Sequence, residues 1–408
     1  MRFVGKKAIT LIAAVLLAGL VAQAGEVITF RTWWGYTGAR IELLNSMLRR
    51  FEEETGIEVR HESPAPFANY LEKLVLDTVG GVQTDVVLGS SFWIADMIDS
   101  GLLQPLDGYL ARTPGLKEDI FPAIWDGVVY RGQVWALPFA GGPQRVTFQN
   151  KDTFSARGLQ TGEGVVSSWD AFLSHVLRLT QDVNGDGVPD VFGLDNANQI
   201  YAFYWTNGAD LFNEDRTDFG FLTPQAIEAL EFMIDLQRRG VVGGDFAKGT
   251  GAMTLTTGPW GMLTFRETVR FDLAMDLPPQ NTDTPRTLSS LDALTLASAS
   301  EHPEAAWKLI EFLLRPDIHA EWAVTTGFPP VRRSEVTTRV FRTAVARDPL
   351  YEPLGQMYEA AVLWPLYPNS NAIWNILRAA VSSVFRGEAP RTALENAHRQ
   401  AQQYLIKE

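Results

Sequence analysis

The chain has no cysteine among its 408 residues. This absence excludes disulfide bonds, thiolate metal sites, cysteine nucleophiles and a lipid anchor on an N-terminal cysteine. Histidine is also scarce, because five residues leave little for a histidine-rich metal centre. Lys and Arg total 35 against 48 Asp and Glu, for a net charge of −13. A chain this acidic is poorly suited to bind nucleic acid or anionic lipid through bulk charge, so neither is expected as a partner.

Long hydrophobic runs are missing except near the N-terminus. Basic residues there precede an apolar run from Ala8 to Val21, and Ala22-Gln23-Ala24 fits the A-x-A rule for cleavage. The run is shorter than the ~20 residues that a spanning helix needs. The sequence therefore predicts a cleaved signal peptide over residues 1–24. It also predicts a protein that works in the periplasm or outside the cell, without a lipid anchor.

Common catalytic signatures are missing too. The sequence has no G-x-S-x-G, no H-E-x-x-H and no Walker A motif. The 48 acidic residues leave room for a carboxylate pair of the glycosidase kind, although nothing singles one pair out. We therefore expect no enzyme, with a secreted glycoside hydrolase as the alternative from another functional class.

Strand and helix patterns alternate along the chain. The first part reads as strand, helix, strand, helix and strand over 26–33, 38–55, 57–61, 67–79 and 84–88. This order predicts a parallel α/β sheet with right-handed crossovers, whose ligands bind at the carboxyl ends of the strands. Further helices are expected over 169–180, after Thr223-Pro224 and from Pro303.

Aromatic residues are abundant, with 12 Trp, 10 Tyr and 23 Phe. Trp169 and Trp307 fall on apolar helix faces and are expected in the core. Other aromatics fall where the chain turns; they are Trp34, Tyr36, Trp93, Trp260 and Trp374. A flat indole covers the apolar face of a sugar while polar groups bind its hydroxyls, so aromatics at several turns suit a carbohydrate site.

One segment resembles a calcium loop. Asp182, Asn184, Asp186 and Asp190 match the D-x-N-x-D-G pattern, but position 12 is Gly193, where calcium loops carry a bidentate Glu. The plainer interpretation is an Asx-rich surface turn. No cofactor or metal is expected, and this loop is the weak calcium candidate.

Five stretches, taken in order, resemble extracellular solute-binding proteins of family 1. These are the sugar-type binding proteins of ABC importers, which include the maltose-binding proteins. The stretches are FEEETG with IEV (51–59), DVVLGSSFWIADMIDSGLLQPL (85–106), GQVWALPFAGGPQRVTFQNKD (132–152), GPW (258–260), and EHPEAAWKLIEFLL with GFPP (301–314 and 327–330). Their order and spacing are more specific than any one of them.

The resemblance implies a two-lobed type II periplasmic binding fold with three hinge crossings. The crossings are expected near 141–144, 287–291 and 331–336. They divide the chain into lobe 1 (25–142 and 290–333) and lobe 2 (143–289 and 334–408). It also implies a carbohydrate ligand, an ABC permease as membrane partner and a monomer. Arg145 and Arg266 motivate a second ligand class, a phosphorylated polyol or other anionic solute. The expected ligand-binding residues are Trp34, Tyr36, Ser91, Trp93, Gln144, Arg145, Tyr201, Trp260, Arg266 and Trp374.

Overall fold

The computed structural model describes residues 26–35, 38–162 and 164–406, so the predicted signal peptide and Tyr36 lie outside the described residues. Within these ranges, no helix is both long and apolar enough to cross a membrane. The strands are β1 (Val27–Arg31), β2 (Glu58–Glu62), β3 (Val86–Ser90), β4 (Leu103–Gln104), β5 (Val129–Tyr130), β6 (Gln133–Val134), β7 (Ala136–Pro143), β8 (Thr147–Asn150), β9 (Met253–Thr254), β10 (Leu273–Asp276), β11 (Thr287–Ala297) and β12 (Ala361–Leu363).

The α-helices are α2 (Ala39–Thr55), α3 (Phe67–Val79), α4 (Ile94–Asp99), α5 (Asp107–Leu110), α6 (Leu116–Asp119), α7 (Pro122–Trp125), α8 (Lys151–Ala156), α9 (Trp169–Leu179), α10 (Ile200–Phe203), α11 (Pro224–Arg238), α12 (Gly261–Thr268), α13 (Pro303–Leu313), α14 (Pro316–Thr326), α15 (Arg339–Arg347), α16 (Ser370–Phe385) and α17 (Pro390–Ala401). One short 3-10 turn used below is η4 (Glu335–Thr337).

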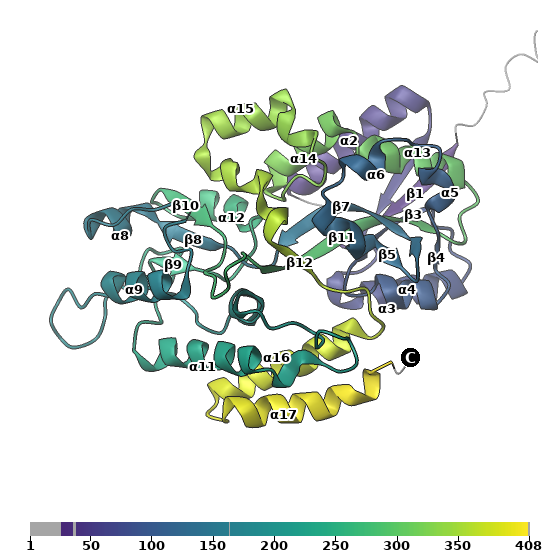
Figure 1. Cartoon of the computed structure of the whole chain (residues 1–408). Coiled ribbons are helices and arrows are strands. Elements are labelled where there is room, and N and C mark those ends of the chain that lie inside the picture. Colours follow the sequence, from purple (N-terminus) through teal and green to yellow (C-terminus); the bar gives the residue numbers. More distant parts are fainter. Residues whose placement is uncertain (1–25, 36–37, 163, 407–408) are drawn as a thin grey trace, which may run out of the picture.

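The larger sheet has the strand order β12-β11-β3-β1-β2, and β4 and β7 also pair with β11. Strand β1 is parallel to both β2 and β3, which confirms the predicted parallel start of the chain. Strand β11 then runs antiparallel to β3 and β7. In Figure 1 this sheet lies on the right, with α2, α13 and α14 above it and α3 and α4 below. The carboxyl ends of β1 and β3 therefore share one edge of the sheet, where ligands of such folds bind.

The smaller sheet has the order β10-β8-β9 and lies on the left in Figure 1. Helices α8, α9 and α12 lie around it, and α11, α16 and α17 pack together beneath it. The result is a mixed α/β molecule with two sheets, each flanked by helices, as the two-lobed fold requires. The exact lobe boundaries at 142/143, 289/290 and 333/334 stay a prediction.

The predicted helices form where their apolar stripes and caps indicate. Helix α2 buries Ile41, Leu44, Leu48 and Phe51, the stripe expected from the 3.6-residue period. At its end Gly56 adopts a left-handed φ of 73° and donates its backbone N–H to the Glu52 carbonyl. Helix α3 has the predicted bounds. Helix α11 begins at Pro224, where the Thr223 side chain accepts a hydrogen bond from the Ala226 backbone N–H.

Three segments meet between the two sheets. Strand β7 approaches β11 so closely that a Cβ on Gly141, whose φ is 126°, would lie 2.1 Å from the Ser290 carbonyl oxygen, so only glycine fits there. The start of β11 also pairs in parallel with β12. The third segment at this place is therefore β12, and the predicted crossing near 331–336 stays a prediction. Residues 331–336 lie beside 119–121, where Arg332 forms a bridge with Ile120.

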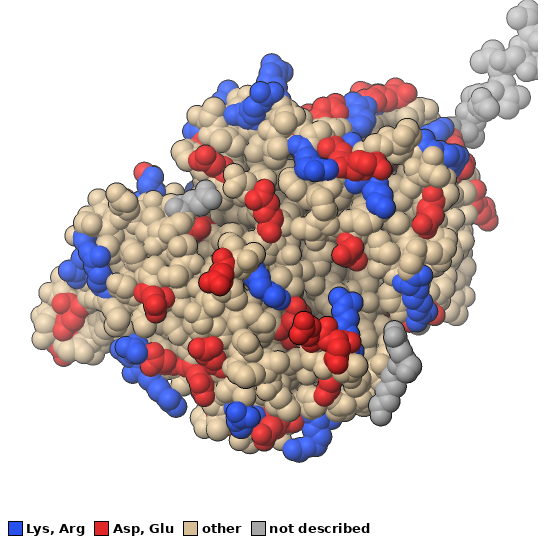
Figure 2. Space-filling view, viewed as in Figure 1, with Lys and Arg blue, Asp and Glu red and all other residues tan. Residues whose placement is uncertain are grey.

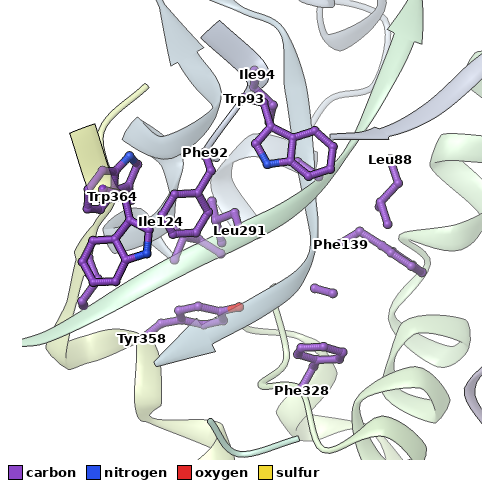
Figure 3. Packing of buried hydrophobic residues seen from close by; sticks show 14 of the residues in the cluster. Leu88, Phe92, Trp93, Ile94, Ile124, Phe139, Leu291, Phe328, Tyr358 and Trp364 are labelled. Carbon is purple, nitrogen blue, oxygen red and sulfur yellow. The ribbon is translucent and has the colours of Figure 1, made fainter. Parts of the chain in front are cut away.

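The main apolar core continues from the larger sheet into the helices beneath the smaller one. Trp169 and Trp307 are 6% and 4% exposed, which confirms that both are core residues. Figure 3 shows part of this core near β11, with Phe92 beside Trp364. A second cluster packs on the smaller sheet and includes Val146, Phe148, Met275 and Phe341. On the face drawn in Figure 2, acidic and basic side chains are interspersed instead of gathered by sign.

Candidate functional site

Side chains from distant segments form a first group at the carboxyl end of the larger sheet, which we call the Arg40 cluster; its members are Trp34, Arg40, Trp260, Asp292 and Phe328. The Arg40 guanidinium carbon lies 5.6 Å from the Trp34 ring centroid and 5.1 Å from that of Phe328. The centroid of the Trp260 ring lies 5.3 Å from that of Phe328. Trp34 and Trp260 are half-buried, so each presents part of its indole outside the core.

Electrostatics within the Arg40 cluster are unfavourable for both charged members. Burial lowers the pKa of Arg40, and the nearby carboxylate of Asp292 offsets part of that effect. Burial also raises the pKa of Asp292 to about 7, with Arg40 acting in the opposite direction. In addition, Arg40 is the second residue of α2, where the positive end of the helix dipole disfavours a cation.

A second group, the Arg145 cluster, contains Phe92, Arg145, Gln199, Tyr201, Trp364 and Trp374. The Arg145 guanidinium lies 4.7 Å above the Tyr201 ring, and its Nε donates a hydrogen bond of 2.8 Å to Gln199 Oε1. Tyr201 in turn lies on Trp374, with ring centroids 4.2 Å apart and planes 30° from parallel. Burial lowers the pKa of Arg145 to about 10. The guanidinium and the two rings thus form one stack.

Phe92 and Trp364 connect this stack to the larger sheet. Phe92 follows β3, and its ring lies 5.1 Å from Trp364, which follows β12. Trp364 meets Trp374 edge-on at 5.6 Å. The backbone N–H of Trp364 also donates to the Ser289 carbonyl of β11 at 3.0 Å. Residues of both halves of the molecule therefore meet where β7, β11 and β12 lie side by side.

Two predicted residues hold the strands of this junction together. The Ser91 hydroxyl accepts a hydrogen bond from the Leu291 backbone N–H at 3.2 Å, and Ser91 is 1% exposed. The Gln144 side chain donates to the Ser290 hydroxyl, while its backbone N–H donates to the Leu288 carbonyl at 2.8 Å. Both side chains are thus occupied by contacts with β11.

Two of the predicted residues, Trp93 and Arg266, lie outside both clusters. Trp93 is 3% exposed, because the rings of Trp33, Phe67 and Tyr70 enclose it at 5.0, 4.7 and 5.5 Å. Arg266 forms an ion pair with Asp348, and its guanidinium lies 4.7 Å from a tyrosine ring at position 351. Tyr36 lies outside the described residues. The remaining predicted residues fall in the two clusters or beside them.

The clusters also contain residues that are not in the expected ligand-binding set: Arg40, Phe92, Gln199, Asp292, Phe328 and Trp364. Two of them carried a signal. Asp292 is the only charged residue among the apolar and hydroxyl side chains of β11. Burying a charge is unfavourable unless a partner offsets the cost, so a lone carboxylate in such a strand indicates a specific role. Arg40 places a cation in the first turn of a helix, against the usual preference. The other four are aromatic or amide residues whose local sequence does not separate core from site.

The Asp182–Asp190 loop uses its carboxylates internally. Asp182 accepts hydrogen bonds from the backbone N–H groups of Gly185 and Gly187, and Asp190 accepts from those of Val183 and Asn184. In the ranges that the structure covers, no group of three or more His, Cys, Asp or Glu residues is placed to hold a metal ion. The side-chain oxygens thus support Asx turns, and calcium binding by this loop stays untested.

Another groove, of about 1010 Å³, lies beside β12; none of the predicted residues lines it, although Trp364 of the Arg145 cluster does. Its walls come from 123–129, 208–225 and 361–366. Arg286 and Asp210 form an ion pair of 3.0 Å within it. Because this groove lacks the stacked aromatic and guanidinium groups and none of the predicted residues lines it, we place the candidate site at the two clusters.

Comparison with known proteins assigns the chain to a family. The model for the bacterial extracellular solute-binding protein family matches residues 37–320. A binding protein of Brucella abortus strain 2308 is 27% identical over 425 residues, covering 96% of this chain and 98% of that protein. The sugar-binding protein MalE of Xanthomonas citri superposes with a TM-score of 0.80 at 20% identity, over 93% of this chain and 97% of that one.

A second solved structure resembles the chain equally well. UgpB of Mycobacterium tuberculosis, in complex with glycerophosphocholine, gives a TM-score of 0.79 at 22% identity, over 93% of this chain and 98% of that one. Both structures share the two-lobed fold described above, and the family model covers more than half of the residues. The chain belongs to the family of bacterial extracellular solute-binding proteins.

Proposed function

We propose that this protein captures a carbohydrate between its two lobes and delivers it to the membrane permease of an ABC importer. It acts as a carrier without catalysis, in the periplasm or outside the cell, after the predicted signal peptide over residues 1–24 has been removed. Family membership supports the role of solute binding, and the sugar-binding MalE structure supports the class of ligand.

The observation that carries the proposal is the stack of Arg145, Tyr201 and Trp374. Sugars combine apolar C–H faces with hydroxyl edges, so a site for them needs flat aromatic surfaces with polar groups at their margins. Tyr201 supplies a half-buried aromatic surface, with Trp374 4% exposed behind it, and Gln199 and Arg145 supply amide and guanidinium groups at its edge. Trp34 and Trp260 supply two more half-buried indoles in the Arg40 cluster.

Closure of the lobes follows from where these residues originate. Phe92 follows β3 of the larger sheet, whereas Tyr201 comes from α10, which packs on α11, and Trp374 comes from α16 beneath the smaller sheet. A ligand that contacts both sets favours the state in which the sets are close together. The closely crossing strands at Gly141 are the place where a small change in backbone angles would move one lobe relative to the other.

A second candidate ligand is an anionic solute such as a phosphorylated polyol. Arg145 favours it, because a half-buried guanidinium suits a phosphate group. The likeness to the structure solved with glycerophosphocholine supports the same alternative. Arg266, the other residue that motivated this class, is occupied by Asp348 and adds nothing to it.

A thermal-shift panel tests the proposal. The purified mature protein is heated with glucose, maltose, maltotriose, glycerol, glucose 6-phosphate and glycerol 3-phosphate. A ligand present at 100 times its Kd stabilises a protein by about 2.7 kcal/mol, which is a readily measured shift. We expect a neutral sugar to give the largest shift and to be recovered unchanged. A larger shift with a phosphorylated compound would favour the second candidate, and hydrolysis products would identify an enzyme.

A further inference from the structure

We propose that Arg40 and Asp292 together hold two adjacent hydroxyl groups of the ligand and select an uncharged polyol over an anionic one. This inference rests on the proposed function and names the chemistry of that same site. It differs from the expectation based on the family resemblance, which pointed to neither residue.

Arg40 has a hydrogen-bond donor that the described residues leave without an acceptor. Its Nε is buried and finds no hydrogen-bond partner among the described residues. Its guanidinium is held between the rings of Trp34 and Phe328 at 5.6 and 5.1 Å. A buried donor left without a partner destabilises the empty protein, so a ligand oxygen that accepts from Arg40 relieves this penalty.

Asp292 complements Arg40 with an acceptor. It lies in β11 opposite Ser90 of β3 and Ala140 of β7, at the irregularity in the pairing of β7 with β11. Strand pairing on both sides fixes its backbone at the carboxyl end of β3. The side chain is half-buried, and only the charge of Arg40 stabilises its ionised form. No hydrogen bond to this carboxylate is found in the described part of the chain.

The two charges attract each other without touching. No contact of 4.0 Å or less joins a nitrogen of Arg40 to an oxygen of Asp292, although each shifts the pKa of the other. One residue sits on a helix between two rings and the other on a doubly paired strand, so neither can relax freely toward the other. A donor and an acceptor held apart in this way fit a ligand that offers both functions.

Adjacent hydroxyl groups offer both functions. One hydroxyl oxygen accepts from the Arg40 guanidinium, and a neighbouring O–H donates to the Asp292 carboxylate. A phosphate matches only half of this arrangement, because its oxygens accept from Arg40 but meet the negative charge of Asp292. Like charges at close range disfavour that complex, which gives the site a means of rejecting phosphorylated analogues.

The test compares Asp292→Asn with the wild type by calorimetric titration at pH 8. The probes are the neutral and phosphorylated compounds of the thermal-shift panel. The asparagine is nearly isosteric and removes a buried charge, so the variant is expected to fold. We expect its affinity for the best neutral sugar to fall at least tenfold. The ratio of its affinity for glucose to its affinity for glucose 6-phosphate should be smaller than in the wild type.

Two further variants are measured in the same way. Arg40→Gln should also lose at least tenfold in affinity for the neutral sugar. Asp210→Asn is the matched control, because Asp210 pairs with Arg286 in the separate groove, and its sugar affinity should be unchanged.

The outcomes separate the two proposals. If the wild type binds a neutral sugar and Asp292→Asn binds it equally well, the role of the charge pair is wrong while the carbohydrate function stands. If the wild type prefers the phosphorylated compound, or binds no sugar in the panel, both are wrong.

Discussion

Two pairs of buried or half-buried titratable side chains differ in how completely their hydrogen bonds are formed. His319 and Glu335 are both 0% exposed, and His319 Nδ1 lies 2.6 Å from Glu335 Oε2. The other ring nitrogen lies 2.6 Å from the Phe139 carbonyl oxygen, and Glu335 Oε1 accepts from the Arg332 backbone N–H at 2.8 Å. In the Arg40 cluster, by contrast, Arg40 Nε has no hydrogen-bond partner among the described residues, and the charge nearest in effect to Asp292 is that of Arg40, which forms no ion pair with it.

The completeness of the hydrogen bonds separates a buried group that stabilises the fold from one that is available to bind a ligand. A buried charge whose hydrogen bonds are complete joins the elements around it, here α14, β7 and η4. A buried charge that is left incomplete lowers stability, and such strain is common at binding sites. We therefore expect disruption of the first pair to unfold the protein and removal of Asp292 to stabilise it.

The largest effect is expected from breaking the complete pair. Glu335→Ala leaves His319 buried without its partner and should reduce the free energy of unfolding by about 3–5 kcal/mol. Urea denaturation followed by circular dichroism measures this. Glu321→Ala serves as the control, since its carboxylate pairs with Arg50 near the surface at 2.8 Å and should contribute no more than ~1 kcal/mol. Equal losses of unfolding free energy in the two variants would mean that the buried pair stabilises the fold no more than the surface pair does.

Two tryptophans in different places, Trp307 in the core and Trp260 in the Arg40 cluster, extend the comparison to apolar residues. Trp307 is 4% exposed and stacks on Tyr109 at 5.2 Å, so Trp307→Ala should cost about 3–5 kcal/mol of stability. Trp260 is half-buried in the Arg40 cluster, and Trp260→Ala should weaken sugar binding about tenfold or more, equivalent to ~1.4 kcal/mol. Its effect on the empty protein should be much smaller. Comparable destabilisation by both substitutions would make Trp260 a core residue.

The pH dependence of stability sharpens the contrast at Asp292. Its pKa is about 7 in the folded protein against an ordinary 3.8, so the folded state binds the proton more tightly. Stability is therefore lost as the pH rises from about 4 to about 7. Asp292→Asn should be more stable than the wild type by about 1–3 kcal/mol at pH 8 and by less at pH 5. Urea midpoints at both pH values decide this, and a variant that is less stable at pH 8 would contradict it.

The smallest effect is expected at Arg266. Its ion pair with Asp348 is partly exposed, so Arg266→Ala should change stability by no more than ~1 kcal/mol. Because the residue lies outside both clusters, sugar affinity measured by calorimetry should be unchanged. A clear loss of affinity would return Arg266 to the binding site.

Local patterns predicted much of this fold. Periodicity and caps located α2, α3, α9, α11 and α13, because those helices bury stripes that the sequence displays directly. Strands β7 and β11 were identified only as crossings through family resemblance. Their pairing joins residues about 150 positions apart, as between Gly141 and Leu291, and that register has no local signature.

The site was predicted less completely, for a related reason. Trp34, Arg145, Tyr201, Trp260 and Trp374 are conspicuous where they stand in the chain, and the structure places them in the two clusters. Trp93 follows a strand just as Trp34 does, but three other rings enclose it, and their positions depend on how α3 packs. The Arg40–Asp292 relation emerges only when α2 and β11 come together.

The most direct test of the central claim is the pKa of Asp292 with and without ligand. It can be followed by carbon-13 NMR of the side-chain carboxyl, with Asp292→Asn used to assign the signal. We expect a pKa of about 7 in the empty protein. We expect it to fall by roughly one unit or more when the best neutral sugar binds, because its hydroxyl groups donate to the ionised carboxylate. A pKa that stays unchanged or rises on binding would contradict the account.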